Sequence, residues 1–371
     1  MFLVPGLEPG VNGVGDYSRR LATEMTNLGW APCLVSLNDS AVPESTTESI
    51  PTRNSKIAVT RLPATWSIER KQTELSHLVA SHHPEWISLQ FVNYGFGERG
   101  LVGAFIRLIH PIVRKTRWHI MFHELWLGLD VKSSLKDRVW GEIQKRQILK
   151  MIRLIRPATI HTHAHPYSSV LTCSGVTPGH LPLFANLPVK LSANKEILDA
   201  DVINVAVFGT LHPQWDPRAA LSSLLSYAEH RDRPVFLRFF GRSGPHKTSS
   251  IERLRQYFGD ALTIITQPIL PDSDLILELE QSHLAFATTP LALWEKSGSI
   301  ALYLDLGLPT IVTRLDWQLR PGIKKNKAPL SELIIPWEEA IDWDKILTLR
   351  RQSSDRLQEI AQRFSTDLRA T

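Results

Sequence analysis

Residues 288–312 read TTPLALWEKSGSIALYLDLGLPTIV, and the pattern around this stretch decides the fold. The apolar residues 283–290 predict a buried strand, residues 296–307 predict a helix, and residues 308–314 predict a second strand. A strand, a helix and a further strand at this spacing are the repeating unit of a parallel sheet covered by helices. We therefore expect an α/β domain here.

The start of the predicted helix carries groups suited to an anion. An ammonium, two hydroxyls and the free amides of a helix N-terminus can converge there on a pyrophosphate. The residues concerned are Lys296, Ser297, Gly298 and Ser299, and Glu295 directly before them suits a hydroxyl of a sugar or ribose. The alternative is an ordinary serine and glycine helix cap beside a solvated lysine.

The same alternation of strands and helices fills the rest of the chain in two blocks. With 371 residues, 43% hydrophobic and 21% charged, the chain is long enough for two globular domains. We expect an N-terminal Rossmann-like domain at 1–185, a linker at 186–201, a second Rossmann-like domain at 202–341 and a helical segment at 342–371.

The overall charge indicates the class of partner, and the cysteines indicate the compartment. A net charge of +5 favours anionic ligands, and because no zinc-ligand or RNA-binding motif is present we expect no nucleic-acid partner. Cys33 and Cys173 lack metal or redox spacing, which is typical of a reducing compartment. The start, MFLVPGLEPG, lacks the features of a signal peptide, so we expect a cytoplasmic protein.

The opening stretch GVNGVGDYSRRLATEM (10–25) places glycines between a short strand and a helix. Gly13, Gly15 and Asp16 resemble a degraded dinucleotide-binding fingerprint, and Asp39 after the next strand would suit a ribose. That fingerprint starts directly after its strand, whereas eight residues separate Val4 from Gly13. The alternatives are a phosphate-binding loop and a plain flexible connection.

Other polar residues follow predicted strands, where ligands of open parallel sheets bind. His123 and Glu124 end WHIMFHE, and they suit a general base or a hydroxyl contact, or a polar helix cap. VAVFGT and LRFFGRS both end in glycine and polar residues that could cradle one phosphate. These candidates are Gly209, Thr210, Gly241, Arg242 and Ser243.

A basic amphipathic helix is expected at 134–155, with its cations concentrated near 138–156. Such a helix can lie on an anionic membrane surface, although most helices of this kind are ordinary surface helices. No cluster of His, Cys, Asp or Glu has metal-ligand spacing, and Asp272-Ser273-Asp274 fits a helix cap, so we expect no metal site.

Together these stretches resemble the GT-B glycosyltransferases of the family-4-like type, in which two Rossmann-like domains face each other across a cleft. PGLEPGVNGVGDYSRRLA resembles the glycine loop near the donor phosphates, FHELW the segment whose histidine contacts the donor sugar, and LPLFANLP the hinge. Residues 288–312 resemble the donor-binding strand, loop and helix. The final helical segment resembles the one that crosses back to the first domain in this fold.

The chain departs from this family at three places. Thr210 stands where the family has an arginine, and the family's lysine a few residues later is absent. The second acid of the family's E-x7-E signature falls on Leu302 or Tyr303. We expect Lys296 and Arg242 to supply the missing positive charge.

The resemblance implies a metal-independent, retaining hexosyltransferase that needs no cofactor. Its donor is a nucleotide-diphosphate sugar, its acceptor a glycan, a lipid-linked intermediate or a small molecule, and its process the synthesis of polysaccharides. His123, Glu124 and Asp16 are then the candidate catalytic residues, and the basic helix offers peripheral contact at the inner face of the membrane. The alternatives are an inactive GT-B scaffold that binds nucleotide-sugar or glycan, a nucleotide-sugar epimerase and an NAD-dependent dehydrogenase.

Overall fold

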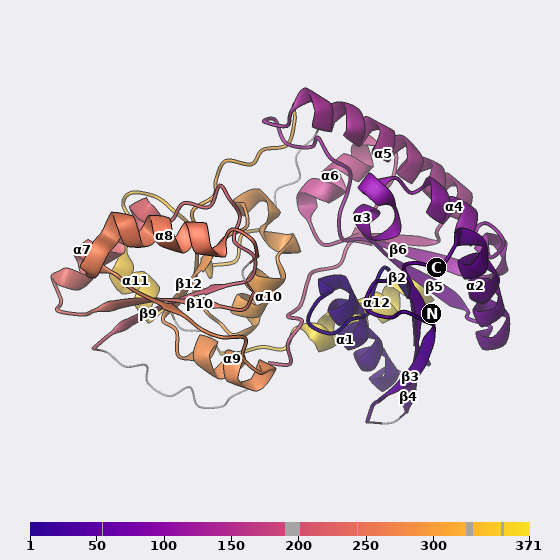
Figure 1. The fold of residues 1–371 in the computed structure, drawn as a ribbon, viewed down its shortest axis with the longest axis horizontal. Coiled ribbons are helices and arrows are strands. Elements are labelled where there is room, and N and C mark those ends of the chain that lie inside the picture. The colour runs from indigo at the N-terminus through magenta and orange to yellow at the C-terminus, as the bar shows by residue number, and fades with distance from the viewer. Residues whose placement is uncertain (54, 190–200, 243, 324–328, 350–351) are drawn as a thin grey trace. The chain divides into compact units, whose positions relative to one another are not determined.

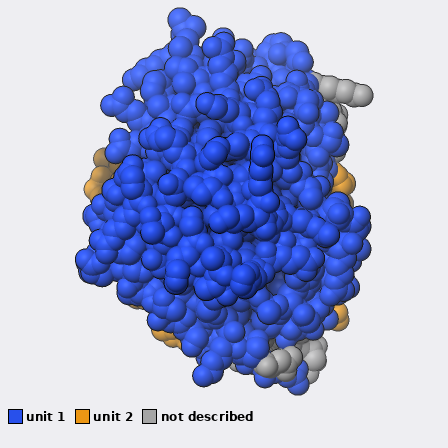
Figure 2. Space-filling view, turned by 90° about the vertical axis from the view of Figure 1, so that its right-hand side faces the viewer, with its two compact units in different colours: residues 1–186, 318–327, 357–371 blue, residues 187–317, 328–356 orange. Residues whose placement is uncertain are grey.

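The computed structural model describes residues 1–371 except 54, 190–200, 243, 324–328 and 350–351. The chain divides into two compact units. Figure 1 shows their strands and helices, and Figure 2 colours unit 1 blue and unit 2 orange. Unit 1 holds the described residues of 1–186, 318–327 and 357–371, and unit 2 those of 187–317 and 328–356.

Unit 1 is built on a sheet whose described strands lie in the order β3-β4-β2-β1-β5-β6-β7-β8. Neighbouring strands are parallel, except that β3 pairs antiparallel with β4 at the edge. The inner strands are apolar and buried, as expected for a parallel sheet covered on both faces. The strands are β1 Phe2–Val4, β2 Cys33–Asp39, β3 Thr46–Pro51, β4 Lys56–Pro63, β5 Trp86–Phe91, β6 Arg117–Phe122, β7 Thr159–Thr162 and β8 Gly179–His180.

Helices close both faces of this sheet. On one face α1 and α12 lie side by side, and Phe364 of α12 packs with Tyr17 and Leu21 of α1 in one apolar core (Figure 1). This core fixes the last helix of the chain against the first. The helices of unit 1 are α1 Gly13–Asn27, α2 Ile68–His82, α3 Asn93–Phe96, α4 Gly103–Ile109, α5 Leu135–Ile155, α6 His165–Cys173 and α12 Leu357–Arg369.

Unit 2 repeats the plan with a parallel sheet in the order β11-β10-β9-β12-β13-β14. Its core joins strand residues such as Val205 and Phe286 to Leu221 and Leu224 of α7. The elements are β9 Ile203–Phe208, α7 Arg218–Glu229, β10 Val235–Phe240, α8 Lys247–Phe258, β11 Thr263–Thr266, α9 Asp272–Glu280, β12 Leu284–Ala287, α10 Gly298–Asp305, β13 Thr310–Val312, β14 Ile334–Pro336 and α11 Trp343–Thr348.

The two units divide the chain differently from the expected domains in two places. Within the expected domain 202–341, the described residues of 318–327 belong to unit 1. The Val131 amide donates to the carbonyl of Gln318, and the Arg320 amide donates to the carbonyl of Leu129. The expected segment 342–371 is divided. Trp343 of α11 is buried in the core of unit 2 and donates to Ser223 at 3.0 Å, whereas α12 lies in unit 1.

The expected linker 186–201 lies mostly outside the described residues, which omit 190–200. Among the helices that the structure describes, none has the length and apolar composition needed to span a bilayer.

Candidate functional site

The candidate donor residues of unit 2 lie at the carboxyl edge of its sheet. Since β9, β10 and β12 are parallel, the loops that follow them share this edge. Gly209 follows β9 with a φ of 102° and Gly241 follows β10 with a φ of 75°, a region that favours glycine. Both glycines therefore have a conformational reason to stand at these strand ends.

A cluster of hydroxyls connects these loops to the start of α10. Thr288 donates from its hydroxyl to the carbonyl of Thr210 at 2.8 Å, and Thr289 donates to Ser297 at 3.1 Å. The hydroxyls of Ser297 and Ser299 lie 3.1 Å apart. A Cβ on Gly209 would lie 3.5 Å from the Ser299 side chain, an ordinary contact, so the end of β9 lies beside the start of α10. Five predicted residues, Gly209, Thr210, Ser297, Gly298 and Ser299, therefore gather here.

Ser297 is also the N-cap of α10, because its hydroxyl accepts from the amide of Ile300 at 3.4 Å. The helix thus begins at Gly298, and Glu295 and Lys296 belong to the 3-10 segment before it. Glu295 is buried and Lys296 half-buried. Arg242 is exposed after β10, and Ser243 lies outside the described residues.

Two further cations at this edge were not predicted from the sequence. The ammonium of Lys247 donates to the carbonyl of Gly241 at 3.3 Å. Arg314, two residues after β13, is 5% exposed and donates to Gln214 at 3.1 Å and Asp316 at 3.3 Å. Their signal in the sequence is the same as that of Arg242, a basic residue soon after a strand.

The position of the second signature acid offers no ligand contact. Leu302 and Tyr303 are 1% and 0% exposed. The Tyr303 hydroxyl accepts from the amide of Phe208 at 2.6 Å, which fixes α10 against β9. Asp305, the acid nearest in sequence, is buried and bonded to Arg356. Leu302, Tyr303 and Asp305 of α10 therefore provide no contact for a ribose.

In unit 1 the structure places Gly13 and Gly15 in the first turn of α1 rather than in the loop before it, and their role in binding phosphate stays a prediction. Helix α1 begins at Gly13, because Asn12 caps it by accepting from the Gly15 amide at 2.9 Å. A Cβ on Gly15 would stand 2.5 Å from the carbonyl oxygen of Gly6, so this glycine lets the helix approach the backbone of the loop. Among Gly10, Gly13 and Gly15, only Gly10, with a φ of 67°, lies in the loop before α1.

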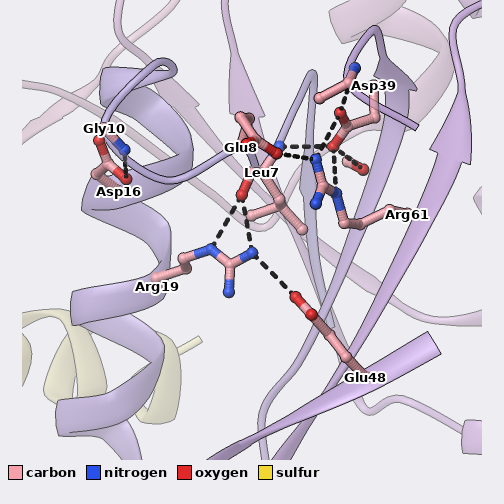
Figure 3. Close-up of polar contacts among 10 residues, drawn as sticks. Leu7, Glu8, Gly10, Asp16, Arg19, Asp39, Glu48 and Arg61 are labelled. Atoms are coloured by element: carbon pink, nitrogen blue, oxygen red, sulfur yellow. Dashed lines mark hydrogen bonds and ion pairs between the residues drawn. The ribbon is translucent and has the colours of Figure 1, made fainter. Parts of the chain in front are cut away.

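The loop between β1 and α1 is held on both sides by charged side chains (Figure 3). Arg61 donates to both oxygens of Asp39 at 2.9 Å and to Glu8 at 2.5 Å. On the other side Arg19 donates to the carbonyl of Leu7 at 2.8 Å and to Glu48 at 3.3 Å.

Asp16, a predicted catalytic residue, accepts from the amide of Gly10 at 3.1 Å, so it ties the loop to the first turn of α1 (Figure 3).

Asp39 is a structural carboxylate in this arrangement. It accepts from the amides of Leu7 and Ala41 and from Ser36 as well as from Arg61. Burial opposes its ionisation, but the bonds from Arg61 and the two amides prevail and lower the pKa of Asp39 to about 2. Because the Asp39 oxygens are engaged in these bonds, Asp39 no longer supports the interpretation of a dinucleotide site in which it would contact a ribose.

His123 lies directly after β6 and is 7% exposed. Its Nε2 contacts Gln90 Oε1 at 2.9 Å and its Nδ1 contacts His163 Nε2 at 2.8 Å. Burial, reinforced by His163 and His119, lowers the pKa of His123 well below its usual range. Both ring nitrogens are thus engaged within unit 1, and Glu124 beside it is half-buried.

One pocket of unit 2 lies away from these residues. It has a volume of about 290 Å³ between the start of α7 and α8, with Trp215, Arg218, Arg253 and Tyr257 in its lining. The candidate donor residues do not line it.

The chain matches no protein-family model, and a search of curated proteins returned no match. Solved structures do match it along almost its full length. They include a glycosyltransferase from Rickettsia africae ESF-5, with a TM-score of 0.51 and 11% identity over 99% of this chain and 87% of that one.

Two further structures match as completely. The catalytic domain of starch synthase IV from Arabidopsis thaliana, bound to ADP and acarbose, gives a TM-score of 0.50 and 12% identity over 100% of this chain and 98% of that one. UDP-GlcNAc 2-epimerase from Methanocaldococcus jannaschii gives a TM-score of 0.50 and 11% identity over 100% of this chain and 99% of that one.

At these identities the likeness shows the fold. The chain has the GT-B fold with two Rossmann-like domains, and this prediction is confirmed. The same fold carries both transferases and an epimerase, so the function has to be argued from the site.

Proposed function

We propose that the chain is a glycosyltransferase of the hexosyltransferase type, with a nucleotide-diphosphate sugar as donor and unit 2 as the donor-binding unit. The acceptor is a glycan, a lipid-linked intermediate or a small molecule. The observation that carries the proposal is the hydroxyl cluster of Thr289, Ser297 and Ser299 at the start of α10, beside Gly209 at the end of β9. Hydroxyls and helix amides at the carboxyl edge of a parallel sheet suit a diphosphate.

The proposed chemistry requires stabilisation of a leaving diphosphate. The bond from sugar to phosphate breaks with negative charge on the diphosphate, and donors already in place lower the barrier. Lys296, Arg242 and Lys247 are the cations proposed for this role, with the α10 amides. Under this proposal no metal is needed, and His123, Glu124 and Asp16 stay predictions for the catalytic residues of unit 1.

A second candidate, an inactive scaffold that binds nucleotide-sugar, is favoured by one observation. The position expected to bind ribose is occupied by the buried Leu302 and Tyr303. Binding without turnover would support this candidate.

Incubation with UDP-, GDP-, ADP- and dTDP-hexoses tests the proposal through release of the nucleoside diphosphate. We expect release with one donor class and a loss of about a hundredfold in Lys296→Ala, the usual effect of removing one charge-stabilising donor. Lys345→Ala, on an exposed position of α11, is the control and should keep the wild-type rate. Recovery of an isomerised nucleotide-sugar would instead identify an epimerase.

We also propose that α5 makes peripheral contact with anionic lipid at the inner face of the membrane. Leu135, Val139 and Ile143, spaced four residues apart, are 77%, 56% and 38% exposed. They form one apolar stripe on the helix, because residues at this spacing share a face. The exposed cations beside it are Lys136, Arg146, Lys150 and Arg153.

Sedimentation with phosphatidylglycerol vesicles tests the membrane contact. We expect binding that weakens with salt and falls at least tenfold in Leu135→Glu/Val139→Glu, since apolar burial and about 1 kcal/mol per cation both contribute. Leu277→Glu changes a leucine of α9 that is 57% exposed, and this variant should bind as the wild type does. Equal binding by both variants would contradict the proposal.

A further inference from the structure

A pocket opens at the amino-terminal edge of the sheet in unit 1, opposite the edge at which His123 follows β6. Its volume is about 590 Å³, within the range of about 300–1,000 Å³ that small-molecule sites occupy. Strands β4, β2, β1 and β5 are parallel neighbours, so their first residues share this edge. Each of these first residues lines the pocket, namely Phe2, Cys33, Lys56 and Trp86. The pocket is therefore separate from the candidate residues that follow the strands.

Two helices contribute to the same pocket. Met25 of α1 and Phe364 and Leu368 of α12 belong to its lining, and each of them is at most 3% exposed. Protein cores leave few voids larger than a water molecule, so a space of this size between packed helices and strands is suited to a ligand. A molecule in the pocket would contact the strands and α12 together.

The buried part of the lining requires an apolar occupant. The indole nitrogen of Trp30 donates to the hydroxyl of Ser365 at 2.8 Å. The hydroxyl of Ser88 contacts Nδ1 of His119, also at 2.8 Å. Apart from Ser88, the buried side chains of the lining belong to Phe, Met, Trp, Leu and Cys. A polar group buried there without a partner would cost free energy, whereas the methylenes of an acyl chain need no partner.

The exposed side chains around the pocket favour an anion. Lys56 is exposed, and within the part of the chain that the structure describes its ammonium has no hydrogen bond or ion pair. Arg117 and Arg369 lie over the rings of the two tryptophans of the lining, 5.7 and 5.5 Å from the ring centres. Glu85, the one acid in the described lining, is paired with Arg117 at 3.7 Å. Cations therefore outnumber acids here, which attracts a negative head group.

We propose that this pocket binds one free fatty acid, with its acyl chain among the buried apolar side chains and its carboxylate at Lys56. The carboxylate accepts a charge-assisted hydrogen bond from the Lys56 ammonium. Ser55 and His82, exposed residues of the same lining, carry groups that can donate to the second oxygen. The ligand is measured without any nucleotide, so this proposal and the proposed function are tested independently.

Calorimetric titration of the full chain with sodium laurate, below the concentration at which it forms micelles, tests the proposal. We expect one laurate to bind per chain at roughly micromolar concentration. Decanoate has two methylenes fewer and should bind about fifteenfold more weakly, because each methylene contributes a factor of about four. Dodecyltrimethylammonium has a chain of similar length and a cationic head, and it should bind about tenfold more weakly than laurate. No saturable binding of laurate, or equal binding of the cationic amphiphile, would overturn the proposal.

A filling substitution locates the acyl chain. Ala58 of β4 is half-buried in the lining, so the ring of Ala58→Phe takes space from the chain. We expect laurate to bind about tenfold more weakly, the effect of displacing roughly two methylenes. Ala80→Phe makes the same change at an exposed position of α2 outside the lining and should bind as the wild type does. Equal binding by the two variants would overturn the proposal, and thermal unfolding without laurate shows that both are folded.

Lys56→Met locates the carboxylate, and Lys115→Met is its control at an exposed position of unit 1 outside the lining. We expect laurate to bind about threefold more weakly in the first variant, the size usual for one exposed ion pair, and unchanged in the second. Equal affinities in the two lysine variants would contradict the place given to the carboxylate. Leu135→Glu/Val139→Glu should also bind laurate unchanged, and a loss there would assign laurate to α5 and overturn the proposal.

Discussion

Replacing Arg61 by methionine is expected to lower the free energy of unfolding by about 3–5 kcal/mol, the usual cost of leaving one charge of a buried pair alone. The Asp39 side chain is 2% exposed and that of Arg61 11%, so water compensates little for the lost guanidinium. The substitution also removes the Arg61 contact of Glu8 and loosens the loop between β1 and α1, which Asp39 holds at the Leu7 amide. Urea unfolding at pH 7 measures the effect.

The same variant should lose part of its disadvantage in acid. The pKa of Asp39 is about 2 in the folded protein and below its value in the unfolded chain, so its contribution is complete above about pH 4. This contribution, roughly 2.5 kcal/mol, disappears as the pH falls from about 4 through 2. The difference between wild type and Arg61→Met should shrink over this window.

Arg146→Met is the control for the loss of an arginine. Its ion pair with Glu142 is exposed, and such pairs contribute about 0–1 kcal/mol. A loss below about 1 kcal/mol in Arg61→Met, or a loss independent of pH, would contradict the role given to Asp39.

Gly15→Ala is the second substitution with a large expected effect. Its new methyl group would stand 2.5 Å from the carbonyl oxygen of Gly6 and 3.3 Å from the Cα of Leu7. Both contacts are with backbone, so α1 or the loop must move, and overpacking of this kind costs about 1–3 kcal/mol. We expect a loss near 3 kcal/mol in urea unfolding.

Gly13→Ala makes the same chemical change two residues earlier in the same helix. There the methyl group would meet only the side-chain nitrogen of Asn186, at 3.7 Å, an ordinary contact. We expect its stability to stay within about 0.5 kcal/mol of the wild type. Equal losses of stability in the two variants would show that the approach of α1 to Gly6 does not restrict which side chain position 15 tolerates.

Much of the fold follows from the sequence because buried parallel strands are continuous apolar runs. The apolar run WISLQF forms β5, the strand expected at 283–290 contains β12, and the helix expected at 296–307 contains α10. The edge strand β3 was missed because TTESIP is polar and almost wholly exposed, so no apolar pattern marks it. Its antiparallel pairing with β4 holds it in place instead.

The start of α1 was misjudged for a local reason. Glycines predict a loop on propensity alone, but Asn12 caps the helix from its side chain and Asp16 occupies its first turn. An asparagine before Gly-Val-Gly-Asp was the available signal. The close approach to Gly6, which needs Gly15, depends on tertiary packing that the local pattern does not contain.

The charged and histidine networks depend on strand register. Ser36 of β2 pairs with Arg61 of β4, which brings Arg61 to Asp39 across 22 positions of sequence. His123 and His163 are 40 residues apart and meet only because β6 and β7 are neighbours. Histidines at spacings of four and two, in WHIMFH and HTH, mark a shared strand face but leave the partner strand undefined.

The measurement that tests the central claim most directly is calorimetric titration of the full chain with UDP, GDP, ADP, dTDP and NADH. The account predicts binding of one nucleoside diphosphate at roughly micromolar concentration and none of NADH. It also predicts affinity at least tenfold weaker in Lys296→Ala, a change of about 1.4 kcal/mol, and unchanged in Lys345→Ala. Binding of NADH alone, no binding of any diphosphate, or equal losses in the two lysine variants would contradict it.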